Sequence, residues 1–245
     1  MGRRRAQGTL VGMSFDRTPQ TRARTAAIAV AASGGIAALA LIGRSRLLRW
    51  GATDEEIAAA QPGDDLISDA KVTATRAITI RRSPDVVWPW IAQLGQGRGG
   101  FYSYDFLENL VGCDIHSADR VLPEWQRLEV GDEVRLAPAA GLKVAILEPG
   151  RALVLQGSLP IARTPPFDST WAFVLCEQPD GATRLLSRER YGYRRWWAPF
   201  VVEPTQAISF VMSRKMLLGI RDRAEGPSLA GAPVGEKELH GVGSR

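Results

Sequence analysis

Four side chains of this sequence could take part in acid–base chemistry. They are two carboxylates, one histidine and one arginine: Asp105, Glu108, His116 and Arg188. Positioned acids and bases transfer protons, and an arginine can stabilise an oxyanion, so the set would suit a cyclase, dehydratase or hydrolase acting on a carbonyl compound. Tyr102 and Tyr104 could add hydroxyl donors. No Ser/His/Asp or Cys/His arrangement can be read from the spacing, and a lone histidine in a polar loop is usually a surface residue.

A second interpretation is binding without chemistry. Four aromatic side chains are expected to line an apolar cavity, although packing in the core is the alternative for each: Tyr102, Tyr104, Trp125 and Trp171. Arg188 is the expected polar member of this cavity. It shares one face of a predicted strand with Arg184, Leu186 and Arg190. That face could be solvated and carry cross-strand ion pairs, or Arg188 could face a cavity and a ligand carboxylate.

Other functional classes have little support in the sequence. Cys113 and Cys176 have no C-x-x-C spacing, and Asp114-x-His116 is too sparse for a metal site, so neither a metal nor a cofactor is expected. The glycines between Gly95 and Gly100 follow a predicted helix, whereas a phosphate-binding loop follows a strand. The net charge of +5 comes mostly from arginines in the first fifty residues. Nucleic-acid binding is therefore not expected, and an arginine-flanked membrane segment is favoured.

The N-terminal region is predicted to anchor the protein. Residues 1–24 form an expected disordered basic arm, and residues 25–43 carry no charge and are about long enough to cross a bilayer. A cleaved signal peptide and a soluble or surface-lying alanine-rich helix are the alternatives. More arginines precede the segment than follow it, which favours a single-pass cell-membrane protein with its domain outside. Residues 44–65 are a predicted linker with a short helix over 47–60, capped by Thr53.

The remaining pattern predicts one α+β domain over residues 66–225, followed by a disordered tail over 226–245. Ile78 and Ile80 alternate with polar residues, as in a strand, and Ser83, Pro84 and Asp85 then suit the start of a helix. Pro89 is expected to kink or split that helix. A short helix is expected over 102–111, with Ser103 as a plausible cap. Five strands and a long helix should follow, over 133–137, 142–147, 152–156, 170–176, 183–193 and 204–224. Short turns between the strands imply an antiparallel meander.

Several segments together resemble the SRPBCC superfamily, the START/Bet v 1-like and polyketide cyclase/dehydrase-related proteins. The segments are Ile78–Ile91, Gly99–Asp105 with Glu108-Asn109, Pro123–Gln126 with Gly131-Asp132, and Met212–Ile220. The resemblance is nearest to a bacterial subgroup with a membrane-proximal N-terminus. It implies a helix-grip fold, in which a curved antiparallel sheet wraps the C-terminal helix around an apolar cavity. No single catalytic motif carries over from the family.

The expected function is a membrane-anchored binding protein for a hydrophobic small molecule or lipid, held between the sheet and the C-terminal helix. The alternative is a cyclase- or dehydratase-type enzyme acting on a polyketide-like or other carbonyl substrate in the same cavity. A structural or stress-associated envelope protein with an empty cavity is a third option. The sequence leaves the ligand and the oligomeric state open.

Overall fold

We describe a computed structural model of the chain, which places residues 43–138, 140–157 and 165–226. The chain divides into two units, Met1–Ser45 and Arg46–Arg245, and every element named below lies in the second. None of the helices in the described ranges is long and apolar enough to span a bilayer. The predicted basic arm, nearly all of the predicted membrane segment and nearly all of the predicted tail lie outside the described residues.

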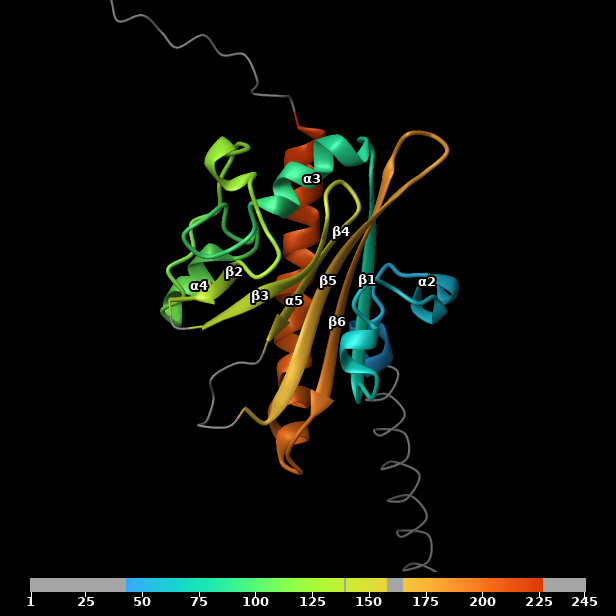
Figure 1. Cartoon of the computed structure of the whole chain (residues 1–245), viewed down its shortest axis with the longest axis vertical. Coiled ribbons are helices and arrows are strands. Elements are labelled where there is room, and N and C mark those ends of the chain that lie inside the picture. Colours follow the sequence, from blue (N-terminus) through green and yellow to red (C-terminus); the bar gives the residue numbers. More distant parts are fainter. Residues whose placement is uncertain (1–42, 139, 158–164, 227–245) are drawn as a thin grey trace, which may run out of the picture. The chain divides into compact units, whose positions relative to one another are not determined.

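The described residues form one antiparallel sheet of six strands, in the order β1-β6-β5-β4-β3-β2 (Figure 1). The strands are β1 (Val72–Ile80), β2 (Glu133–Ala137), β3 (Ala140–Glu148), β4 (Ala152–Gly157), β5 (Phe167–Glu177) and β6 (Thr183–Tyr193). The predicted meander from β2 to β6 is thus confirmed, and β1 adds to its far edge by pairing with β6. At the β5–β6 turn, Gly181 has a φ of +78°, a conformation that glycine adopts without steric cost.

The long helix α5 (Ala198–Glu225) packs against β1, β6 and α3. It begins six residues before the predicted start at Pro204. Pro199 lies in its first turn, where the backbone N–H has no partner within the helix, so a proline there does not weaken it. Pro204 lies inside the helix. Gly219 allows a close contact, since a Cβ there would lie 2.2 Å from the carbonyl oxygen of Tyr102. This long helix against an antiparallel sheet is the α+β arrangement that the sequence pattern predicts, and it is consistent with the helix-grip fold that the resemblance implies.

The short helices differ from prediction in their bounds. They are α2 (Asp54–Ala58), η1 (Asp65–Ile67), α3 (Pro84–Ala92), α4 (Asp105–Leu110) and η2 (Pro123–Trp125). The predicted helix over 47–60 was too long: the capping box of Thr53 and Glu56 starts a new helix at Asp54. Pro89 lies within α3 without ending it, and the Ser83 side chain makes no capping bond. Tyr104, rather than Ser103, is the N-cap residue of α4.

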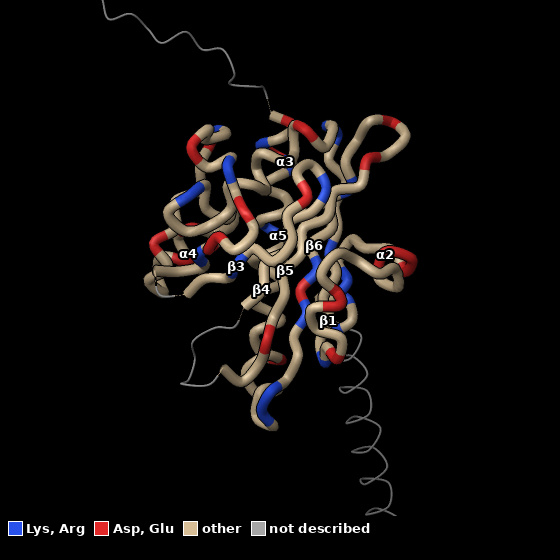
Figure 2. The backbone as a smooth tube through the Cα atoms, in the orientation of Figure 1, with Lys and Arg blue, Asp and Glu red and all other residues tan. Residues whose placement is uncertain are grey.

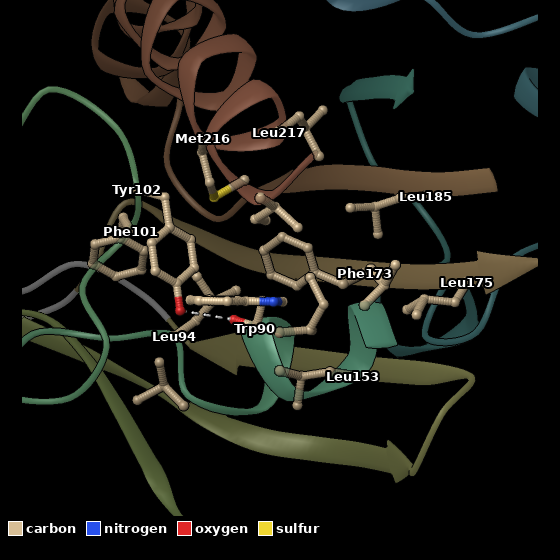
Figure 3. Packing of buried hydrophobic residues seen from close by; sticks show 14 of the residues in the cluster. Trp90, Leu94, Phe101, Tyr102, Leu153, Phe173, Leu175, Leu185, Met216 and Leu217 are labelled. Atoms are coloured by element: carbon tan, nitrogen blue, oxygen red, sulfur yellow. Dashed lines mark hydrogen bonds between the residues drawn. The ribbon is translucent and has the colours of Figure 1, made fainter. Parts of the chain in front are cut away.

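Both faces of the sheet are covered. On one face, residues from β4, β5, β6, α3 and α5 form the main hydrophobic core, including Trp90, Leu153, Phe173, Leu185 and Leu217 (Figure 3). On the other face, a smaller cluster that includes Val154, Ala172 and Leu186 packs against Leu66 and Ala52. Residues 49–67, which we call the N-terminal strap, cover this second face.

Arginines of β6 hold the strap against the sheet. Arg184 pairs with Glu56 at 2.7 Å, and Arg188 pairs with Asp64 at 2.6 Å. Arg188 also donates to the carbonyl oxygens of Glu56, Ile57 and Ala59, and its side chain is only 3% exposed. Figure 2 shows acidic α2 beside the strands. The arginine face of β6 is therefore covered by the strap, which the sequence did not predict.

Candidate functional site

Two adjoining hollows lie between α5 and the inner face of the sheet. The first, the Glu189 cavity, has a volume of about 190 Å³ and is bounded by β5, β6 and α5. The second, the apolar groove, has a volume of about 650 Å³ and lies between α4 and the N-terminal half of α5. Leu136, Trp171 and Met212 belong to the walls of both. One elongated molecule could therefore occupy the two together.

The apolar groove is lined almost entirely by hydrocarbon. Its walls include Phe101, Leu107, Val111, Ala207, Ile208 and Val211. Concave apolar surface with a few polar groups is the usual character of a small-molecule site. The polar exceptions are Glu108 and Cys113, which both line the groove. The groove thus offers a ligand extensive apolar contact and one carboxyl group.

Only one of the two oxygens of the Glu108 carboxyl group has a hydrogen-bond partner among the described residues. Its Oε1 accepts a hydrogen bond from Ser103 Oγ at 2.9 Å, whereas its buried Oε2 has no partner among the described residues. Burial raises the pKa of Glu108 above its ordinary value, the Ser103 bond opposes this, and Asp105 adds to the rise. The pKa of the neighbouring Cys113 thiol is raised by burial and by Glu108. Burial therefore shifts the titration of both groups toward the neutral form, as expected of groups beside apolar surface.

Replacing Glu108 by Gln should change the pH dependence of stability. The carboxyl has a higher pKa in the folded protein than in the unfolded chain, so its contribution is fully present at low pH and is lost as the pH rises through the folded pKa. Glu108→Gln removes this loss. The variant should therefore gain stability relative to wild type as the pH rises from about 4 toward neutrality, by under about 1 kcal/mol because solvent screens a half-buried group.

The measurement is urea unfolding of wild type and Glu108→Gln across this pH range. Glu124→Gln is the control, since Glu124 is an exposed glutamate on η2. It should show no such trend. A difference between Glu108→Gln and wild type that stays constant with pH would contradict the assignment.

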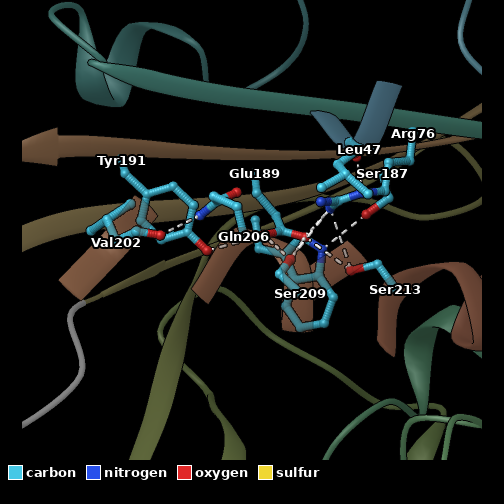
Figure 4. Close-up of polar contacts among 10 residues, drawn as sticks. Leu47, Arg76, Ser187, Glu189, Tyr191, Val202, Gln206, Ser209 and Ser213 are labelled. Carbon is cyan, nitrogen blue, oxygen red and sulfur yellow. Dashed lines mark hydrogen bonds and ion pairs between the residues drawn. The ribbon is translucent and has the colours of Figure 1, made fainter. Parts of the chain in front are cut away.

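The end of the Glu189 cavity is a buried polar cluster (Figure 4). Arg76 Nη1 donates to Glu189 Oε1 at 2.6 Å, and the Arg76 side chain is 0% exposed. Ser213 Oγ donates to the same oxygen at 3.0 Å, while Ser209 Oγ and Tyr191 OH donate to Oε2 at 2.7 Å and 3.0 Å. Four donors from β1, β6 and α5 thus converge on one carboxylate, which makes its burial tolerable.

Tyr191 acts in this cluster as a hydrogen-bond donor. Burial raises its pKa well above the ordinary value, and the Glu189 charge and hydrogen bond raise it further. The phenol therefore keeps its proton at neutral pH and donates to Glu189. Arg76 is anchored from its other side, because its Nε donates to the Leu47 carbonyl oxygen at 3.2 Å.

Trp171 forms a fixed wall between the two hollows. Its indole Nε1 donates to Ser187 Oγ at 2.9 Å. Its ring stacks on Phe101 with centroids 6.0 Å apart and packs against Phe173 at 4.9 Å. These contacts hold the ring in one orientation, so the connection between the hollows has a defined shape.

The other aromatic residues predicted to line the cavity lie elsewhere. Tyr102 is buried in the core beside Trp90, to whose carbonyl oxygen its hydroxyl donates at 3.1 Å (Figure 3). Tyr104 is partly exposed at the start of α4. Trp125 lies in η2, where Arg98 stacks over its ring at 4.7 Å. None of these three is among the residues that line the two hollows.

The four predicted acid–base candidates are not brought together. Glu108 lines the groove, but Asp105 accepts hydrogen bonds from the backbone and hydroxyl of Ser117 and so ties down a loop. His116 is exposed, and its Nδ1 lies 3.7 Å from Asp114. Arg188 lies on the opposite face of the sheet against the strap, not in the predicted ligand cavity. Four residues of the site were not predicted from the sequence: Arg76, Glu189, Ser209 and Ser213. A lone arginine within the otherwise apolar strand β1 was the available signal.

No family model matches this chain, and no curated protein matches it. Among solved structures, protein MLL2253 from Mesorhizobium loti is 15% identical, covers 62% of this chain and 96% of its own, and gives a TM-score of 0.37. CalU16 from Micromonospora echinospora is 17% identical, covers 62% of this chain and 83% of its own, and gives a TM-score of 0.32. At such identities and TM-scores the similarity carries no conclusion about function.

Proposed function

We propose that this protein binds a hydrophobic small molecule or lipid between α5 and the sheet and is held at the cell membrane by residues 25–43. The observation that carries the proposal is the apolar groove of about 650 Å³, whose lining is almost wholly hydrocarbon. Filling such a groove removes apolar surface of both ligand and protein from water, which drives association.

The rim of the groove supports a hydrophobic ligand. Val111 of the loop after α4 is 77% exposed, and Ile208 of α5 is 66% exposed. Val211, a further wall residue of the groove, is exposed as well. Exposed apolar side chains gathered around one groove are typical of an interaction site. A ligand entering the groove would cover part of this apolar surface.

Membrane attachment rests on the sequence. Residues 25–43 carry no charge and have arginines on both sides, and the arginine excess on the N-terminal side favours a domain outside the cell membrane. Arg194, Arg195, Trp196 and Trp197 could also touch the lipid surface. Trp196 is 83% exposed and contacts only Phe200 as a ring partner among the described residues. An anchor of this kind would keep the groove close to hydrophobic ligands dissolved in the bilayer.

The test is native mass spectrometry of the detergent-extracted full-length protein, with identification of any small molecule that co-purifies. Val211→Asp should lower occupancy at least about tenfold, because the ligand would have to desolvate a carboxylate in the groove. Thr205→Asp is the matched control, since Thr205 is exposed on the same helix and is not among the groove residues. A protein without adduct that also fails to bind added apolar probes would refute the proposal.

The runner-up is a cyclase- or dehydratase-type enzyme acting on a carbonyl compound. One observation favours it: Glu108 lines the groove with a raised pKa and an unpartnered Oε2, as a general acid would. NMR can follow deuterium exchange next to the carbonyl of an added ketone. Exchange that full-length wild type accelerates and Glu108→Gln does not would establish catalysis. Exchange at the uncatalysed rate in both would leave binding as the function.

A further inference from the structure

We propose that the ligand is a neutral molecule with a hydrogen-bond-donating head, an alcohol, which points into the Glu189 cavity while its apolar body fills the groove. This inference rests on the proposed function. It concerns the polar end of the site, where the direction of the hydrogen bonds around Glu189 determines which ligand groups can find a partner.

The first step is the direction of the hydrogen bonds. A carboxylate only accepts, so each hydroxyl bonded to Glu189 must donate its single proton to it. Ser209 Oγ lies 2.7 Å from Oε2, and Ser213 Oγ lies 3.0 Å from Oε1. Both serines line the cavity. Because their protons are engaged, these oxygens can accept but not donate. Each also accepts from Arg76 Nη1, at 3.4 Å and 3.5 Å, which leaves one lone pair of each hydroxyl for a ligand.

The second step concerns the other side-chain donors on the wall of the cavity. Arg76 Nη2 has no partner among the described residues, but Arg76 is fully buried and is not a wall residue. Thr170 is a wall residue, but it pairs with Arg190, on the face of the sheet opposite Glu189. Tyr191 donates its proton to Glu189, and the indole N–H of Trp171 donates to Ser187. Ser169, a further wall residue, donates to the Gly157 carbonyl oxygen at 3.0 Å. A ligand carbonyl or carboxylate would therefore meet acceptors here and stay without a partner, which is costly in a desolvated site. A ligand hydroxyl would find acceptors.

The third step concerns charge. Arg76 balances the Glu189 charge at 2.6 Å and is fully buried, so a ligand anion cannot reach its guanidinium. A ligand ammonium would bring an unbalanced positive charge to a pair that is already neutral, at a large desolvation cost. The neutral donor is thus the favoured head group. Trp171 and Met212 line both this cavity and the groove, so the apolar body of a ligand could extend past them from one into the other.

The test compares three probes with the same chain: dodecanol, dodecyl methyl ether and dodecanoate. Dissociation constants for the full-length protein in amphipol are measured by equilibrium dialysis against protein-free amphipol. Dodecanol should bind about tenfold tighter than the ether, the value of one buried neutral hydrogen bond. The double variant Ser209→Ala/Ser213→Ala should reduce this preference below about threefold. Ser68→Ala, which changes an exposed serine outside both hollows, should keep it.

The outcomes separate the two proposals. Equal binding of alcohol and ether by wild type would overturn the head-group assignment and leave a hydrophobic binding function standing. Tighter binding of dodecanoate would overturn it too, since an anion would then be recognised. No measurable binding of any probe would refute both. The comparison within wild type needs no substitution and therefore does not depend on the variants folding.

Discussion

Replacing Glu189 by Gln should lower the free energy of unfolding by about 3–5 kcal/mol. The substitution keeps the size of the side chain but removes the charge that balances Arg76, which is 0% exposed and lies 2.6 Å from the carboxylate. A buried guanidinium without a counter-charge is among the costliest defects a core can carry. Ser209, Ser213 and Tyr191 would also lose an ionic acceptor. Urea unfolding monitored by circular dichroism measures the effect.

Two further variants identify the cause of that loss. The double variant Arg76→Met/Glu189→Gln removes both charges and keeps an amide oxygen that can accept from the hydroxyls. It should recover most of the stability, because the desolvation cost disappears along with the attraction. Arg151→Met breaks an exposed pair with Glu148 and should cost under about 1 kcal/mol. Loss of stability in the double variant equal to that in Glu189→Gln would show that unpaired charge is not the cause.

Replacing Arg188 by Met should destabilise the protein by about 2–4 kcal/mol and release the N-terminal strap. Arg188 bonds Asp64 at 2.6 Å, Thr75 at 3.0 Å and three strap carbonyl oxygens between 2.7 and 3.1 Å. Methionine preserves much of the stem packing but none of these bonds. The strap should therefore open at a cost lower than global unfolding, and elastase should cut near Ala58 faster than in wild type.

Arg194→Met is the control for the strap experiment. Arg194 follows the same strand but forms a mostly exposed pair with Asp168, so its loss should change stability little and leave cleavage of the strap unchanged. Unchanged elastase cleavage in Arg188→Met would mean that apolar contacts of Leu66 and Ala52 hold the strap without the arginine.

The candidate site was only partly predictable. The sequence correctly separated the two faces of β6, with Arg184, Arg188 and Arg190 on one and Ser187, Glu189 and Tyr191 on the other. It did not show which face would meet α5. The placement depends on strand register, since β1 pairs Thr75 with Arg188 and Arg76 with Ser187. That register brings Arg76 beside Glu189, 113 residues further along the chain.

The sequence by itself determined the elements whose causes are local. The strand periods, the glycine turns between strands and the Thr53–Glu56 capping box depend on residues within a few positions of one another. Only the tertiary structure decided that Arg188 binds the strap, that Glu189 gathers donors from three elements, and that Trp171 separates two hollows. Those features depend on which distant segments pack together. Packing buries the charged side chains and brings their hydrogen-bond partners into reach.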